Sequence, residues 1–106
     1  MFSFVETKLF TRLFDEMFSD DAELSKLQDF LGKNPEVGDI IPGSGGVRKM
    51  RWAAPGRGKR GGVRVIYYLR SRQGQIWLLT LYSKSETDSI PGRILKQIKE
   101  EIDDDI

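Results

Sequence analysis

The apolar residues change their spacing along the chain, and this change constrains the fold more than any other feature. Up to Leu31 they recur at intervals of three and four, the period of a helix with one buried face. From Val47 to Tyr82 they alternate with polar residues or form short β-branched and aromatic runs, which is typical of strands. Helical spacing returns at Pro91. Runs of helices and strands kept apart in this way predict an α+β domain.

Helix breakers and caps give the expected bounds. Thr7 predicts the N-cap of a helix ending at Phe18, a second helix is expected from Asp21 to Gly32, and a third from Pro91 to Ile102. Residues predicted to face the core are Leu9, Phe10, Leu13, Phe14, Met17, Phe18, Leu24, Leu27, Phe30, Leu31, Ile94, Leu95, Ile98 and Ile102.

Four segments are expected to be strands, the first of them at a sheet edge. They are 2–5, 47–52, 63–69 and 76–82, and the turn Arg72-Gln73-Gly74 predicts that the last two pair antiparallel. Segment 38–46 is rich in turn residues, and the connection 53–62 mixes glycine with basic residues, a composition that cannot pack a core but can follow a ligand surface.

Length and composition exclude several classes of protein. With 106 residues, the chain is expected to be one domain, 1–106. No apolar run is long enough for a membrane span and no signal peptide is evident, so we expect a soluble, unprocessed protein. Cysteine and histidine are both absent. We therefore expect no disulfide, metal or cofactor, a cytoplasmic location, and any chemistry to run on Lys, Arg, Tyr or carboxylates.

Charge is segregated along a chain that is nearly neutral overall, with 17 basic and 16 acidic residues. No acidic residue lies between Asp39 and Glu86, where ten basic ones occur, so the rest of the chain is strongly acidic. This basic block predicts a polyanionic ligand, and the alternative is a solvated basic face without one. Its members are Arg48, Lys49, Arg51, Arg57, Lys59, Arg60, Arg64, Arg70, Arg72 and Lys84.

Strand parity sorts these basic residues. Lys49 and Arg51 share one face of their strand, and Arg64 joins them if the next strand pairs in the matching register. Nearby positive charges favour the neutral form of a lysine, which makes Lys49 a candidate base. The alternative is that each long side chain simply reaches water from a sheet edge.

Three segments occur in a recognisable order: Gly38 to Arg51, Gly56 to Tyr68 and Leu79 to Glu86. They resemble the RelE/ParE toxin superfamily, specifically its HigB-like branch, and the likeness covers nearly the whole chain. The resemblance implies the RelE-like microbial RNase fold: a small, twisted, antiparallel-rich sheet with two N-terminal helices packed on one face and a C-terminal helix. One departure is that RelE itself has a tyrosine on its C-terminal segment that stacks on the substrate base, whereas no aromatic residue follows Tyr82 here.

The activity implied is that of a type II toxin, an endoribonuclease that cleaves mRNA in the ribosomal A site and is silenced by an antitoxin encoded beside it, which we expect to be a helix-turn-helix protein. Carried over by motif, Lys49 is the candidate base or charge stabiliser, Arg51 and Arg64 are candidate phosphate clamps, and Lys84 is a further donor. Candidate RNA-binding residues, with Trp52 as a further stacking candidate, are Arg48, Arg57, Lys59, Arg60, Tyr68 and Tyr82.

Two other classes of function stay open on the sequence. One is a ParE-like inhibitor of DNA gyrase with the same fold, although such proteins generally lack the full basic cluster. The other is a non-catalytic RNA-binding module, which the missing histidine and C-terminal tyrosine favour.

Overall fold

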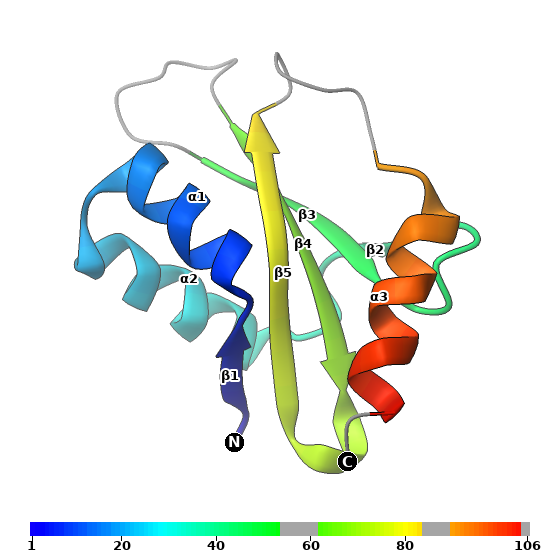
Figure 1. The fold of residues 1–106 in the computed structure, drawn as a ribbon. Helices are drawn as coiled ribbons and strands as arrows, with labels where there is room; N and C mark the ends of the chain where they lie inside the picture. Colours follow the sequence, from blue (N-terminus) through cyan, green and yellow to red (C-terminus); the bar gives the residue numbers. More distant parts are fainter. Residues whose placement is uncertain (54–61, 84–89, 105–106) are drawn as a thin grey trace.

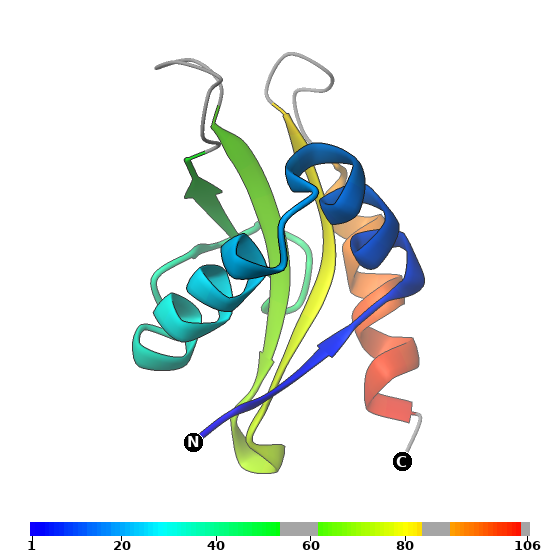
Figure 2. The same cartoon turned by 90° about the vertical axis from the view of Figure 1, so that its left-hand side faces the viewer.

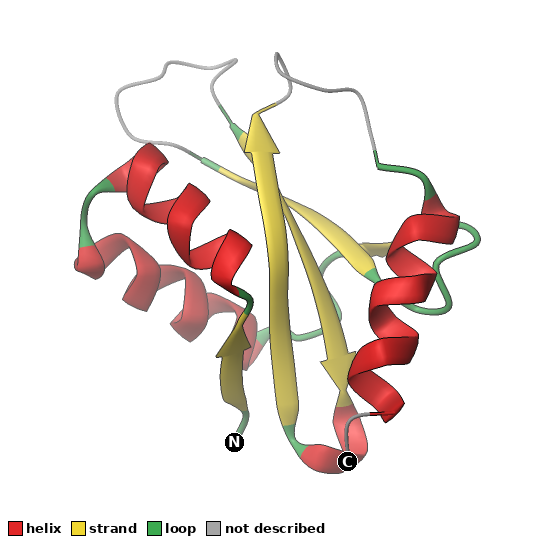
Figure 3. Cartoon of the chain, viewed as in Figure 1, coloured by secondary structure: helices red, strands yellow, loops and turns green. Residues whose placement is uncertain are grey.

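The computed structural model describes residues 1–53, 62–83 and 90–104 of the chain. In these residues helices flank a central sheet (Figures 1 and 3), and the fold is α+β as predicted. The elements in chain order are β1 (Ser3–Glu6), α1 (Lys8–Phe18), α2 (Asp21–Lys33), β2 (Asp39–Ile40), β3 (Arg48–Trp52), β4 (Val63–Arg70), a 3₁₀ turn (Ser71–Gln73), β5 (Gln75–Ser83) and α3 (Gly92–Asp104).

The sheet has the strand order β1-β5-β4-β3-β2. β2, β3, β4 and β5 pair antiparallel in sequence, while β1 pairs parallel to β5 at one edge. The edge position of the first strand and the hairpin between the last two are therefore confirmed. Two features were missed: the short strand β2 inside the turn-rich segment, and the parallel direction of β1.

Local sequence explains how the helices begin. The Thr7 side chain accepts a hydrogen bond from the Phe10 backbone N–H at 3.0 Å and so caps α1 as expected. Asp20 caps α2 by accepting from the Ala22 N–H at 2.9 Å, and the acidic first turn of α2 suits the positive end of its helix dipole.

Each face of the sheet has its own apolar core. One lies beneath α1 and α2 and includes Phe10, Leu27 and Tyr67, while the other lies beneath α3 and includes Ile66 and Leu95. Figure 2 shows α2 and α3 on opposite sides of β4 and β5. The two N-terminal helices thus cover one face and the C-terminal helix the other.

Three of the residues predicted to face the core are substantially exposed. Leu9, Phe30 and Ile94 expose 44%, 36% and 41% of their surface, so the periodic stripes extend past the buried face of each helix. Phe30 still contacts the Trp52 ring, with centroids 5.8 Å apart.

A charged network fastens α3 to the β4–β5 hairpin. Asp103 accepts from the Tyr68 hydroxyl at 3.0 Å and forms ion pairs with Arg70 at 3.3 Å and Lys99 at 3.1 Å. Burial raises the pKa of Asp103, but the hydrogen bonds from Lys99 and Tyr68 and the charges of Lys99 and Arg70 outweigh burial and hold the pKa below its ordinary value. The network thus ties the C-terminal half of α3 to the β4–β5 hairpin.

Close backbone contact fixes the other end of α3. At Gly92, an added Cβ would collide with the carbonyl oxygen of Pro42, so only glycine allows α3 to begin this close to the segment that follows β2.

Among the described residues, no helix has the length and apolar character needed to span a membrane.

Candidate functional site

Strand register brings three basic side chains onto one face of the sheet. Arg51 on β3 lies directly opposite Arg64 on β4, and Lys49, two residues before Arg51, lies opposite Ile66. Opposed residues of an antiparallel pair share a face, so Lys49, Arg51 and Arg64 form one group, here called the cationic patch. The pairing on which the predicted patch depended is confirmed.

The cationic patch carries no paired countercharge within the described part of the chain. None of its three side chains takes part in an ion pair or hydrogen bond there. One carboxylate, that of Asp39 on β2, lies directly across from Lys49 and borders the patch, but no ion pair joins the two. Like charges placed directly opposite on a sheet destabilise it, so the Arg51–Arg64 pair costs folding energy that no described contact repays.

Other arginines of the basic block serve the fold instead. Arg48 lies on the opposite face, where its guanidinium donates to the carbonyl oxygens of Gly38 at 2.7 Å and Glu36 at 3.2 Å. Arg70 is buried and bound to Asp103 and Gln75. Arg72 is exposed in the 3₁₀ turn at the far end of β4. The structure therefore does not bring Arg48 to the patch, although the sequence placed it among the RNA-binding candidates.

Tyr82 places a phenol beside the cationic patch. It lies opposite Arg64 on β5, and the residue is 7% exposed within the core beneath α3. No described residue hydrogen-bonds to its hydroxyl, and no buried polar side-chain atom of the described residues lacks a partner, so the hydroxyl reaches solvent. Burial raises the pKa of Tyr82, and the nearby charge of Arg64 opposes this rise only in part. Tyr82 is therefore protonated at neutral pH and can donate a hydrogen bond, which the sequence, where it was a stacking candidate, did not indicate.

The two other aromatic candidates have structural partners. The Tyr68 hydroxyl donates to Asp103 beneath α3. Burial, and after it the Asp103 carboxylate, raises the pKa of Tyr68. The Trp52 indole N–H donates to the buried Glu23 carboxylate at 2.9 Å, which ties β3 to α2. Neither ring belongs to the patch.

Four predicted site residues lie outside the described residues: Arg57, Lys59, Arg60 and Lys84. In the sequence, 54–61 connects β3 to β4 and 84–89 follows β5. What the described residues assemble is a cationic surface with one free phenol. Guanidinium and ammonium groups bind phosphate oxygens, and a protonated phenol can donate to an oxyanion or a leaving oxygen.

No family model matches the chain.

Proposed function

We propose that this protein is the toxin of a type II toxin–antitoxin system, a cytoplasmic endoribonuclease that cleaves mRNA in the ribosomal A site. Two things support the proposal: the resemblance of the three sequence segments to the HigB-like branch of the RelE/ParE superfamily, and the geometry of the patch. The observation that carries it is the set of Lys49, Arg51 and Arg64 on one sheet face beside Tyr82, without an ion pair to any residue that the structure describes.

The proposed reaction is an internal phosphoryl transfer in the RNA. The 2′-hydroxyl of one nucleotide loses its proton and attacks the adjacent phosphorus, the bond to the 5′-oxygen of the next nucleotide breaks, and that oxygen takes up a proton. The products are a 2′,3′-cyclic phosphate on one fragment and a 5′-hydroxyl on the other. The reaction needs a base, positive charge around the phosphorane, and a proton donor.

Each requirement has a candidate in the patch. Arg51 and Arg64 are the clamps, since their planar forks match the phosphate oxygens and their mutual repulsion is relieved when an anion lies between them. Lys49 takes the 2′-hydroxyl proton or adds charge to the clamp. Tyr82 supplies a proton to the leaving 5′-oxygen, as its raised pKa keeps it protonated. Lys84, outside the described residues, is a second candidate donor.

The partners follow from the same chemistry. Such a site is open and made of few groups, so a ribosome that holds the message in place would supply much of the rate by positioning. The antitoxin, proposed to be a helix-turn-helix protein, would cover the cationic patch at least in part with acidic side chains.

Induced expression of the chain in bacteria tests the proposal. We expect growth arrest and truncated mRNAs whose new 5′ ends carry hydroxyl groups, with chromosomes intact. An SOS response with broken DNA and intact mRNA would instead indicate a gyrase inhibitor. RNA binding without new RNA ends would indicate a non-catalytic module. Either result refutes the ribonuclease.

A further inference from the structure

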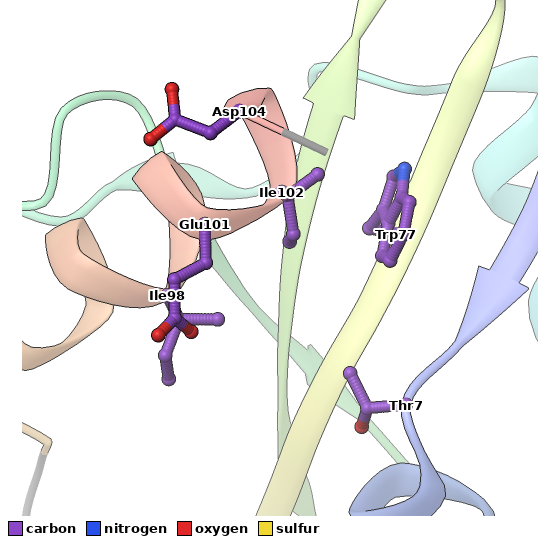
Figure 4. Close-up of a pocket in the computed structure, with 6 residues that line it drawn as sticks. All are labelled: Thr7, Trp77, Ile98, Glu101, Ile102 and Asp104. Atoms are coloured by element: carbon purple, nitrogen blue, oxygen red, sulfur yellow. The ribbon is translucent and has the colours of Figure 1, made fainter. Parts of the chain in front are cut away.

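A second site lies under α3, away from the cationic patch. A groove of about 580 Å³ runs between α3, β5 and the start of α1, and it is here called the α3 groove. Its lining residues are Thr7, Trp77, Ile98, Glu101, Ile102 and Asp104. Figure 4 shows the Trp77 ring beside Ile102 on the floor, with the Glu101 side chain running along α3 next to Ile98.

The floor of the groove offers apolar and aromatic surface but no free hydrogen-bonding group. The Thr7 hydroxyl donates to the Leu79 carbonyl oxygen at 2.7 Å and accepts from the N–H that it caps. The Trp77 indole N–H donates to the Gln75 side-chain oxygen at 3.0 Å. A ligand on this floor is therefore held by burial and by the face of the indole ring, which attracts cations.

The rim of the groove is acidic. Glu101 and Asp104 are exposed, and neither forms an ion pair with any residue that the structure describes. The nearby cations Arg70 and Lys99 are both engaged by Asp103, so they do not neutralise the rim carboxylates. An aromatic and aliphatic floor below unpaired carboxylates is complementary to a basic side chain with a long apolar stem.

We propose that the α3 groove is a docking site for a protein segment that presents an arginine or lysine next to an apolar residue. The stem of the basic side chain lies on Trp77 and Ile102, its cationic head is directed to the carboxylates of Glu101 and Asp104, and the neighbouring apolar side chain fills the floor by Ile98. The volume of the groove exceeds what one basic side chain fills, which favours a segment with adjacent apolar residues over a small polyamine. Docking here does not depend on ribonuclease activity, because the cationic patch is a separate set of residues.

The probe is a capped Gly-Arg-Leu-Arg-Gly peptide, titrated into ¹⁵N-labelled protein. The chain has 2 tryptophans, so the Trp77 indole N–H signal can be told from that of Trp52 by one Trp52→Phe variant. We expect the Trp77 signal to shift saturably and the Trp52 signal to stay in place. The same peptide with citrulline in place of arginine keeps the shape without the charge, and it should bind several-fold more weakly.

A matched pair of variants localises the interaction. Glu101→Gln removes one rim charge, and Glu100→Gln makes the same change in net charge at an exposed neighbour that does not line the groove. We expect a roughly threefold loss of affinity in the first and none in the second, as for one exposed ion pair. The proposed segment site would be overturned by equal losses of affinity in both variants or by the absence of a saturable Trp77 shift. It would also be overturned if the citrulline peptide bound equally well, or if spermidine alone produced the same Trp77 shift.

Discussion

The Arg51–Arg64 pair should destabilise the fold, and this can be measured directly. The two residues lie opposite each other on neighbouring strands, and neither has a counterion among the described residues. Replacing either with glutamine keeps a polar side chain and removes one charge. Each single replacement should relieve the repulsion, while the second replacement should add nothing further from this source. A double-mutant cycle therefore isolates the repulsion between them.

The strand register sets the expected size of the repulsion between Arg51 and Arg64. Cβ atoms of such a pair lie ~5 Å apart, and we place the two guanidinium groups at ~7 Å because long like-charged side chains splay. At that distance the repulsion is ~0.6 kcal/mol in water. Debye screening leaves ~0.5 kcal/mol at ~0.01 M salt and less than ~0.1 kcal/mol at ~1 M salt.

Urea unfolding is the suitable assay, because urea is uncharged and the salt concentration can be varied independently. Wild type, Arg51→Gln, Arg64→Gln and the double variant are compared at low and high salt. The control cycle combines Arg51→Gln with Arg72→Gln. Arg72 lies at the far end of β4, so it should show no coupling to Arg51. A coupling that is absent or attractive at low salt, or that persists at high salt, would refute the view that these arginines face each other unpaired.

Other consequences of the structure can be tested separately. Asp103→Asn should lower the free energy of unfolding at neutral pH by about 1–3 kcal/mol, because it leaves the buried Arg70 without its carboxylate. Since the pKa of Asp103 is depressed in the folded state, the stability that its carboxylate contributes is present above the unfolded pKa of about 4 and is lost as the pH falls through the folded pKa. The free energies of unfolding of variant and wild type, measured in urea, should therefore converge in acid. A difference that persisted in acid would contradict the network. Gly92→Ala should destabilise the protein because its Cβ meets Pro42. Gly32→Ala in α2 should stabilise it by about 0.5–1 kcal/mol, because the added Cβ would make only an ordinary van der Waals contact with the Phe4 ring. Thermal melts that ranked the two variants the other way would be inconsistent with the packing of α3. For the proposed antitoxin, stopped-flow association should slow steeply between about 50 and 500 mM salt, and a flat profile would exclude charge-steered masking of the patch.

Most of the fold could be predicted from local pattern. The helices and the four longer strands followed from periodicity, caps and turn residues, all of which act over a few positions. The strand β2 was missed because two residues give no period to detect. The parallel pairing of β1 with β5 joins residues far apart in the chain, and no short-range signal encodes its direction.

The site could be predicted only in part, because a count of charges treats every arginine alike. Parity placed Lys49 and Arg51 on one face, since the alternation of a strand is local. Arg64 joined them only on the condition of a matching register, which the pairing of β3 with β4 meets. That Arg70 is neutralised by Asp103 depends on where α3 docks, and the binding of Arg48 to backbone carbonyls depends on the path of the chain before β2. The free hydroxyl of Tyr82 likewise appears only when the strands are assembled.

Mapping mRNA ends in a purified translation reaction tests the central claim most directly. Lys49→Ala and Arg64→Ala are compared with Arg72→Ala, which removes one positive charge outside the cationic patch, and all three should remain folded because truncating exposed or half-exposed residues costs well under about 1 kcal/mol. We predict that wild type and Arg72→Ala generate new 5′-hydroxyl ends in ribosome-bound messages, and that Lys49→Ala and Arg64→Ala generate none. Undiminished cleavage by a folded Arg64→Ala protein would contradict the assignment of the cationic patch as the catalytic surface.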